Sequence, residues 1–359
     1  MRFLTPVVIL LALAVLGVAA AIAWAGHTFR QFEEVTAAGD LACTPVVGIA
    51  GAGDIEPLPG TRSAFLAAFD RRGGASRGEI LLFDTDNPLD DSSWRDRTKG
   101  VPAAFVPSGI DLYRAALPEG RMLTRLFVVN LAGPEIILFE VGADGSLTVG
   151  ERFSDPRLVS PNDVVATGPR SFYVTNDTAS GRQSLKGKID FLLGLKTGTI
   201  MHYDGNSWSI VDDGLAFPNG LALTADATRL HVAEMRARRL VDYDRDPSTD
   251  TIRRTGAVAL DNFPNNLSVT PDGDILVGTL PQPLATSAYG EGLRDEAASE
   301  VVSVTDGQVS TLFRDPGETI PGVTMATRLE GKLLIGSRAA DRFLMCDAGA
   351  RAGAGAAGR

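Results

Sequence analysis

Three stretches of the chain share one pattern, and this pattern decides the fold class. They read Pro161-Asn162-Asp163-Val164-Val165-Ala166, Pro218-Asn219-Gly220-Leu221-Ala222-Leu223 and Pro264-Asn265-Asn266-Leu267-Ser268-Val269. In each stretch a Pro-Asn pair opens a strand-like run, and a turn and a second apolar run follow. The prolines are about 57 and 46 residues apart, close to the length of one blade of a β-propeller.

The rest of the chain is organised in the same way. Short strand-like runs alternate with Gly, Pro, Asp and Asn from Val46 onward, among them residues 80–83, 126–129, 136–139, 172–174 and 333–335. The roughly 310 residues of this region are enough for six blades. Two packed β-sandwiches are the structural alternative, but the Pro-Asn repeat argues against them. We therefore predict an all-β, six-bladed β-propeller over residues 28–347.

Three segments depart from this strand pattern. We expect a short helix over residues 28–38 and a brief surface helix over residues 189–195. The last twelve residues, 348–359, consist only of Ala, Gly and Arg. Such a low-complexity composition predicts a disordered tail.

The N-terminus carries an export signal. Residues 3–25 are almost wholly apolar and follow Arg2, and about 20 apolar residues can span a bilayer as a helix. Ala23-Trp24-Ala25 offers a cleavage site, so residues 1–27 are a membrane anchor or a signal segment; a buried soluble helix is the remaining alternative. We favour the anchor because the run is longer than a typical signal core. The propeller would then lie on the periplasmic or extracellular side, or be secreted if cleavage occurs.

Composition and cysteine content narrow the function further. The 359 residues carry a formal net charge of −10, which argues against nucleic acid as a partner and is compatible with divalent cations. Cys43 and Cys346 are the two cysteines of the chain. They could be buried free thiols, but in an oxidising compartment a disulfide between them is favoured. Such a bond would join the first and last strands of a propeller.

The repeated asparagines suggest a site for calcium. A single Pro-Asn pair would be explained by turn formation, because Asn bonds to nearby backbone. Three pairs at matching positions of a propeller converge on the central channel, where amide and carboxylate oxygens can form the oxygen-rich cage that calcium requires. Zinc is disfavoured because the chain has only three histidines and none is paired.

Other hydrolytic motifs are weak. Residues 74–78 match Gly-x-Ser-x-Gly, but a strand follows them instead of the helix that a nucleophile elbow needs, so a Gly-rich turn is the better interpretation. His202 and His231 lie inside strand patterns, where a structural role is favoured over a catalytic one. A triad built on histidine therefore has little support.

In its motifs the sequence resembles the paraoxonase/arylesterase family, a relative of the gluconolactonase-type propellers. The resemblance runs from about Cys43 to Cys346. It is carried by residues 160–164 with 173–177, residues 217–220 with 232–234, and residues 265–269, 298–301 and 331–336. The order of these blocks along the chain points to this family more than to propellers in general.

The resemblance implies two calcium ions in the channel. The positions that match the structural ion's ligands are Asp54, Asp163 and the backbone carbonyl of Ile110. The resemblance implies that this chain keeps the family's type of ligand at all three. Those that match the catalytic ion's ligands are Gly53, Asn162, Asn219, Asn265 and Asn266. The family has Glu and Asp where this chain has Gly53 and Asn265, so the second ion should bind much more weakly. Glu56, close by in the sequence, is the acidic residue that could compensate.

The resemblance also implies a change in the catalytic residues. The family's two proton-transfer histidines are matched by Ser108 and Leu131, and a further channel histidine by Leu280. Ser and Leu cannot act as a general base near neutral pH. The catalytic residues therefore stay unassigned. We expect a calcium-dependent hydrolase of lactones or aryl esters with weakened activity; the alternative is a non-catalytic, membrane-anchored propeller that binds a ligand or a protein.

Overall fold

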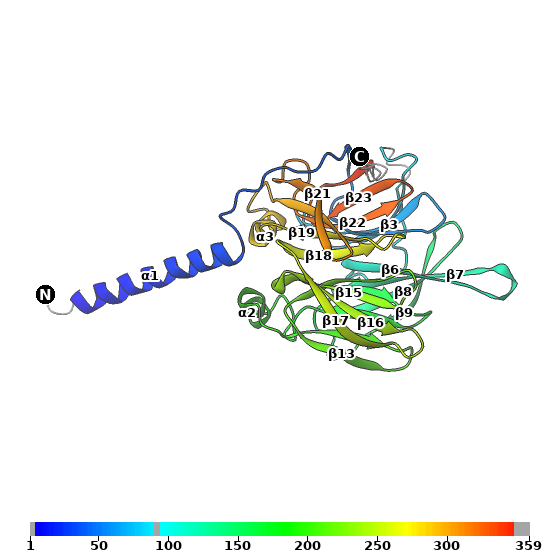
Figure 1. The fold of residues 1–359 in the computed structure, drawn as a ribbon, viewed down its shortest axis with the longest axis horizontal. Helices are drawn as coiled ribbons and strands as arrows, with labels where there is room; N and C mark the ends of the chain where they lie inside the picture. The colour runs from blue at the N-terminus through cyan, green and yellow to red at the C-terminus, as the bar shows by residue number, and fades with distance from the viewer. Residues whose placement is uncertain (1–3, 90–93, 348–359) are drawn as a thin grey trace, which may run out of the picture.

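The strands of the chain form six sheets of four strands each (Figure 1). The computed structural model describes residues 4–89 and 94–347. The first three sheets comprise β2 (Ala52–Pro57), β3 (Ser63–Ala68), β4 (Glu79–Asp84) and β5 (Arg95–Asp96); β6 (Pro107–Ala116), β7 (Met122–Asn130), β8 (Glu135–Val141) and β9 (Leu147–Phe153); and β10 (Pro161–Ala166), β11 (Phe172–Asn176), β12 (Gly198–Tyr203) and β13 (Trp208–Leu215). The other three comprise β14 (Pro218–Leu223), β15 (Arg229–Glu234), β16 (Arg239–Asp246) and β17 (Thr251–Ala259); β18 (Phe263–Val269), β19 (Ile275–Leu280), β20 (Ser299–Thr305) and β21 (Gln308–Asp315); and β22 (Val323–Leu329), β23 (Lys332–Ser337), β24 (Arg342–Asp347) and β1 (Cys43–Val47).

The six sheets are the blades of a closed propeller, which confirms the predicted fold. The innermost strands β2, β6, β10, β14, β18 and β22 each contact the next one, and β22 contacts β2. In the last blade the outermost strand is β1, which comes from the beginning of the chain and pairs with β24. Cys43 and Cys346 face each other in this pairing and form the predicted disulfide, with an S–S distance of 2.02 Å.

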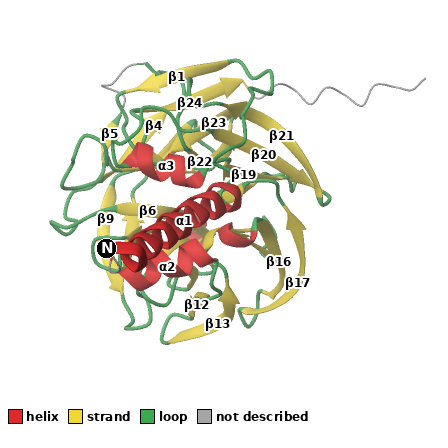
Figure 2. Cartoon of the chain, turned by 90° about the vertical axis from the view of Figure 1, so that its left-hand side faces the viewer, coloured by secondary structure: helices red, strands yellow, loops and turns green. Residues whose placement is uncertain are grey.

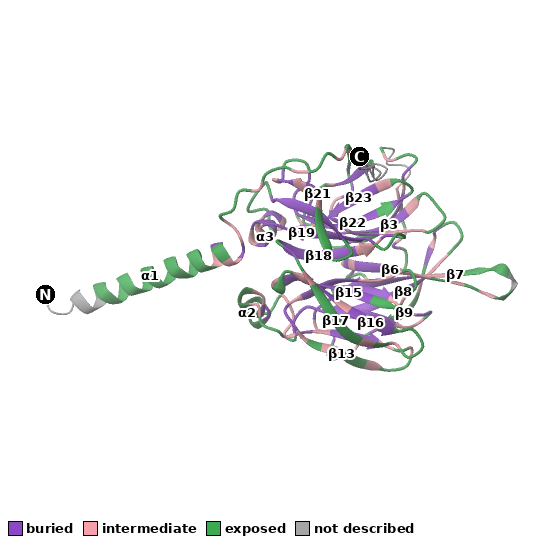
Figure 3. Cartoon of the chain, viewed as in Figure 1, coloured by how far each residue is buried: buried purple, intermediate pink, exposed green. Residues whose placement is uncertain are grey.

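The core lies between neighbouring blades, because each strand presents alternate side chains to the blade on either side. Phe83 of the first blade meets Phe343 of the last, with ring centroids 4.9 Å apart. Phe127 and Phe172 make the equivalent contact between the second and third blades at 5.5 Å. Buried residues therefore run through the whole body of the propeller, whereas exposed residues lie on the outer strands and loops (Figure 3).

Three α-helices lie on one side of the propeller: α1 (Leu4–Thr28), α2 (Leu185–Leu193) and α3 (Pro283–Gly290) (Figure 1). In Figure 2, which looks at that side, α2 and α3 lie on either side of α1. The expected surface helix over residues 189–195 is confirmed by α2, which starts four residues earlier because Ser184 caps the backbone N–H of Gly187. Within the described residues there are also two short 3-10 helices, η2 (Pro118–Gly120) and η3 (Met235–Ala237).

Helix α1 has the length and composition of a membrane-spanning or signal helix. The stretch Val8–Thr28 has a mean hydropathy of 2.7, and its apolar side chains, such as Leu10 and Leu16, are exposed along the helix. The helix projects away from the propeller (Figure 1). These features agree with the interpretation of residues 1–27 as an anchor or a signal segment. The predicted disordered tail, residues 348–359, lies outside the described residues.

The short helix expected over residues 28–38 is wrong. The helix ends at Thr28, and Arg30 adopts a left-handed backbone conformation with φ of 55°. This turn lets Phe29 bury its ring completely between Phe263 of β18 and Phe191 of α2, with ring centroids at 5.9 and 5.6 Å. The chain then runs as an irregular segment along the rim. Side-chain burial therefore overrides the local helical preference.

Candidate functional site

A bulge near the start of the innermost strands brings the predicted site residues to the channel. The register of β10 with β11 shifts between Pro161 and Val164, and β6, β14 and β18 shift at the equivalent place, as do β2 and β22. Adjacent side chains of a regular strand point to opposite faces, whereas a bulge redirects them. Asn162 and Asp163 consequently both line the channel, Asn162 towards the end that α2 covers and Asp163 towards the other end.

Close packing of the innermost strands explains two glycines in the bulges. A Cβ on Gly109 would lie 2.0 Å from the carboxylate of Asp163, and a Cβ on Gly220 would lie 2.5 Å from the Cα of Asn266. Any larger residue would push the neighbouring strand away. These glycines therefore allow the strands to approach closely enough for side chains of one strand to bond to the backbone of the next.

The end of the channel opposite the helices, here called the acidic end, contains the positions predicted for the structural ion. Asp54 accepts a hydrogen bond from the backbone N–H of Ile110 on the next strand at 2.7 Å, and Asp163 accepts one from Leu221 at 2.9 Å. Both carboxylates are buried, with 6% and 4% of their surface exposed. The structure therefore brings Asp54, Asp163 and Ile110 to one cavity, while their role as metal ligands stays a prediction.

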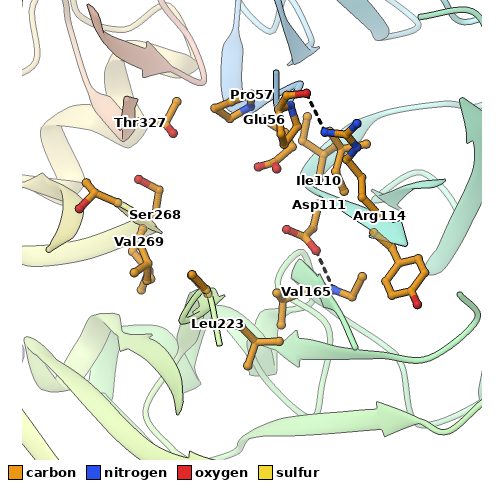
Figure 4. A pocket seen from close by; sticks show the side chains of 18 of the residues that line it. Glu56, Pro57, Ile110, Asp111, Arg114, Val165, Leu223, Ser268, Val269 and Thr327 are labelled. Atoms are coloured by element: carbon orange, nitrogen blue, oxygen red, sulfur yellow. Dashed lines mark hydrogen bonds between the residues drawn. The ribbon is translucent and has the colours of Figure 1, made fainter. Parts of the chain in front are cut away.

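Two further carboxylates, Glu56 and Asp111, line the same cavity of about 610 Å³ (Figure 4). Asp111 accepts a hydrogen bond from the backbone N–H of Ala166 at 2.8 Å. Burial in the channel raises the pKa of Asp54 and that of Asp111 to about 7. Burial, together with the negative charge of the neighbouring carboxylates, also raises the pKa of Glu56 and of Asp163.

Four acidic groups line this cavity, but no three acidic, histidine or cysteine residues of the described chain are grouped closely enough to hold a metal ion by themselves. In the described part of the chain, no Lys or Arg forms an ion pair with any of them. Buried carboxylates without a counter-charge are costly, and calcium prefers oxygen ligands of this kind. Glu56 lies at this end, so it does not supply a carboxylate to the other site; its expected compensating role is wrong.

The end of the channel on the helix side, here called the asparagine end, contains Asn162, Asn219, Asn265 and Asn266. They line one small recess of about 40 Å³ and are all nearly buried. The Oδ1 atoms of Asn219 and Asn266 are buried without a hydrogen-bond partner in the described chain. Asn162 donates a hydrogen bond to Asp177 at 2.8 Å. The predicted convergence of these side chains is therefore present, while their role as metal ligands stays a prediction.

Three arginines, which the sequence did not single out, line the same recess: Arg71, Arg182 and Arg338. Arg182 pairs with Asp177 at 2.5 Å. Arg71 and Arg338 have no ion pair and no hydrogen bond among the described residues; Arg71 lies over the ring of Phe69 at 5.1 Å. Burial, followed by repulsion from the other arginines, lowers the pKa of Arg338 to about 10 and that of Arg71 to about 9. Both guanidinium groups stay charged at neutral pH.

This donor set does not fit a second calcium ion. The residues that match the family's ligands provide no carboxylate, since Gly53 and Asn265 replace the acidic ones. Three guanidinium groups and no carboxylate line the recess; Asp177 pairs with Arg182, and Glu291 acts on Arg338 from the pocket above. The remaining excess of positive charge disfavours a divalent cation. The two ends of the channel therefore have opposite charge.

Above the recess lies a wider pocket of about 400 Å³, which shares Asn162, Asn219, Asn265, Arg182 and Arg338 with it. Its walls come from α2, α3 and the adjacent loops. They carry an apolar set, Phe191, Leu192, Phe217, Met235, Leu280 and Leu284, together with polar residues that include Lys188 and Glu291. A pocket with apolar walls and a few polar groups at its base is typical of a site for a small organic molecule.

The histidine positions are occupied by residues that cannot exchange protons. Ser108 lines the recess, Leu280 lines the wider pocket, and Leu131 packs into the core between the second and third blades. The histidines of the chain lie elsewhere: His231 bonds to Asp242 at 2.7 Å and His202 lies 3.4 Å from Asp250, both on interior strands of a blade. These contacts support a structural role for both.

The Gly-x-Ser-x-Gly match at residues 74–78 is part of the loop between β3 and β4, which form a hairpin. It is followed by a strand, as expected, and Ser76 is absent from both cavities of the asparagine end. The match is therefore a turn and not a nucleophile elbow.

Comparison with known proteins agrees with the propeller fold. The family model described as Arylesterase matches residues 44–348, which is most of the chain. The chain belongs to the arylesterase family. Among curated relatives, serum paraoxonase/arylesterase 1 of Rattus norvegicus is 29% identical over 336 residues, which cover 89% of this chain and 92% of the relative. Serum paraoxonase/lactonase 3 of Homo sapiens is 27% identical over 353 residues, which cover 91% of this chain and 96% of the relative.

Solved structures support the fold of this arylesterase-family chain. A gluconolactonase from Xanthomonas campestris matches with a TM-score of 0.55 at 16% identity, over 86% of this chain and 90% of that one. The calcium-binding protein regucalcin from Agrobacterium tumefaciens matches with a TM-score of 0.52 at 14% identity, over 85% of this chain and 92% of that one. At these identities the likeness establishes the propeller architecture alone.

Proposed function

We propose that this chain hydrolyses lactones or aryl esters in the pocket at the asparagine end of the channel. Its membership of the arylesterase family supports this, as do the names of its relatives, which include arylesterases and a lactonase. The observation that carries the proposal is the pocket itself, because it combines apolar walls with a polar, electropositive base. Such a pocket can hold the apolar part of an ester and direct its carbonyl oxygen towards the recess.

The residues at the base of this pocket define what chemistry is available. Arg338 forms no hydrogen bond or direct ion pair among the described residues, although Asp177 and Glu291 act on it electrostatically. Its N–H groups can therefore donate to a carbonyl oxygen and stabilise the oxyanion that develops in ester hydrolysis. The Asn219 side chain can orient the substrate beside it. No histidine stands at positions 108 and 131 to activate water. We therefore expect slower turnover than an enzyme with a positioned base achieves.

Calcium belongs at the acidic end in this proposal. Asp54, Asp163 and the carbonyl of Ile110 would hold the ion, with Glu56 and Asp111 nearby. When bound there, calcium supplies positive charge that neutralises the buried carboxylates and ties three innermost strands together. Activity would depend on calcium through the integrity of the channel, since the recess where the substrate binds is at the other end of the channel formed by the same innermost strands.

The cellular setting follows from the N-terminal helix and the disulfide. Helix α1 and the pocket are on the same side of the propeller, so an uncleaved anchor would hold the pocket facing the membrane (Figures 1 and 2). A disulfide persists in an oxidising compartment. We propose that the domain lies on the periplasmic or extracellular side, where lactones and esters soluble in membranes can reach it.

A direct test uses the full chain purified in mild detergent. Initial rates are measured with a short-chain lactone, a long-chain lactone and phenyl acetate, in calcium and after chelation. We expect hydrolysis above that of a heat-inactivated sample, lost after prolonged chelation. Asn219→Ala should reduce the rate, whereas Asp272→Asn, which changes an exposed turn residue, should not. Failure to hydrolyse any of the three substrates in calcium would contradict the proposal.

The second candidate is a propeller that binds a ligand without turning it over. It is favoured by one specific observation, which is that leucine and serine occupy the positions of the family's histidines in and around the pocket. Absence of hydrolysis combined with saturable binding of a lactone in the pocket would establish this candidate.

A further inference from the structure

The recess at the asparagine end has properties that hydrolysis alone does not explain. Its three guanidinium groups are drawn from different parts of the ring: Arg71 follows β3, Arg182 lies between β11 and α2, and Arg338 follows β23. Among the described residues, one of the three has an ion-pair partner, Asp177. Asp177 and Glu291 act electrostatically on Arg338, but neither Arg338 nor Arg71 forms a direct ion pair among the described residues. The recess therefore keeps an excess of positive charge, which a bound anion would neutralise.

The position of Arg338 explains why a cation is excluded. It reaches the recess directly beside Gly53, where the family has an acidic ligand for calcium, and Asn265 replaces the second acidic ligand. The two negative charges that the family resemblance implies at positions 53 and 265 are absent, and three arginines line the same recess. The site of this chain is therefore richer in positive charge than a calcium site requires.

The shape of the site limits the size of the group that fits. The recess of about 40 Å³ has room for roughly three water-sized groups, which corresponds to a carboxylate. The wider pocket above it has apolar walls that suit a hydrocarbon or aromatic body. A ligand with a negative head and an apolar body would place its head against Arg338 and Arg71 and its body against Phe191 and Leu284.

We infer that the asparagine end of this propeller is a binding site for an apolar monocarboxylate, whose anionic group takes the place of a calcium ion. A guanidinium group bonds to a carboxylate through two parallel N–H donors, which makes the interaction strong and directional. The inference does not depend on turnover, since binding alone requires none of the groups that activate water.

Phenylacetate and its neutral counterpart phenylacetamide provide a matched pair of probes. Binding of each to the full chain in mild detergent is measured by isothermal titration calorimetry at low ionic strength. We expect phenylacetate to bind at least tenfold more tightly, the change expected for hydrogen bonds to a charged group. Added salt should weaken the binding of phenylacetate and leave that of phenylacetamide unchanged. Equal binding of the two probes would overturn the inference.

Variants locate the site. Arg338→Gln should weaken phenylacetate binding about tenfold or more, and Arg338→Lys should retain part of it because the charge is kept. Arg328→Gln removes an exposed positive charge at the opposite end of the channel and should have no effect. A melting curve shows whether each variant is folded. If Arg338→Gln does not fold, Arg71→Gln is used as the recess variant in its place. An unchanged affinity in the folded recess variants, or an equal loss in Arg328→Gln, would overturn the assignment.

Discussion

The side chain of Arg338 occupies the space next to Gly53: a Cβ on Gly53 would lie 3.2 Å from the Cβ of Arg338. The family resemblance places an acidic calcium ligand at position 53. In this chain the missing side chain of Gly53 and the arginine therefore lie at the same place. The recess at the asparagine end is lined by three arginines and no carboxylate, whereas Asp54 and Asp163 remain at the acidic end.

Restoring the family's acidic residues should restore a calcium site only if Arg338 is removed. We expect Gly53→Glu with Asn265→Asp to be poorly stable, because the introduced glutamate side chain would crowd Arg338. The triple variant that adds Arg338→Ala should bind one calcium ion more than the original chain. Calcium binding is measured by isothermal titration calorimetry. An extra ion in the double variant, with Arg338 in place, would contradict the explanation.

Loss of one carboxylate at the acidic end should remove the stabilising effect of calcium. In Asp163→Asn we expect the melting temperature to become insensitive to calcium, because a charged ligand is lost. The variant should also melt lower without calcium, since Asp163 accepts backbone N–H groups from Val164 and Leu221. Asp272→Asn is the control. Differential scanning calorimetry with and without calcium separates the two effects. If calcium raises the melting temperature of Asp163→Asn as much as that of the original chain, the proposed site is contradicted.

The disulfide should make a large contribution because it closes the ring. Cys43–Cys346 spans 303 residues and ties β1 to β24. The chain-entropy model gives about 5–6 kcal/mol for a loop of this length, and measured losses are typically about 2–5 kcal/mol. We expect Cys43→Ser/Cys346→Ser to lower the free energy of unfolding in urea by an amount in this range. A reductant should destabilise the original chain and leave the double variant unaffected; equal stability of the two chains would refute this role.

Phe29 should hold the segment after the anchor against the propeller. Its ring is fully buried beside Phe263 and Leu280, and the guanidinium of Arg236 lies 4.4 Å from its centroid. Replacement of a buried Phe by Ala typically costs about 3–5 kcal/mol. Phe29→Ala should therefore speed limited proteolysis between α1 and β1. Phe32→Ala, which truncates a 63% exposed side chain, should leave the rate unchanged. Similar rates in both variants would contradict the docking.

Much of the fold could be predicted from the sequence because its signals are local and repeated. The Pro-Asn pairs open β10 and β14 and lie near the start of β18, and the spacing between them gave the blade length. The disulfide between the two cysteines could be predicted because an exported chain folds in an oxidising compartment. The segment after Thr28 was mispredicted because a single long-range contact, the burial of Phe29, decides where the helix ends.

The site could be predicted only in part. Residues opening the innermost strands were found because they repeat, whereas Asp111 and the three arginines do not recur at matching positions. Arg71, Arg182 and Arg338 are far apart in the sequence, and only the closed ring brings them to one recess. Glu56 could be named only as a candidate to compensate for the lost charge, because its place three residues after Gly53 does not show which way the bulge in β2 turns the strand; the structure places it at the acidic end.

The number of calcium ions bound to the folded chain tests the account most directly. Isothermal titration calorimetry of the metal-free full chain, with Asp163→Asn as the reference, counts the ions and assigns them to an end of the channel. We predict one calcium ion per chain, absent in Asp163→Asn. Two ions per chain, or one ion that survives in Asp163→Asn and is lost in Asn219→Ala, would contradict the excess of positive charge at the asparagine end.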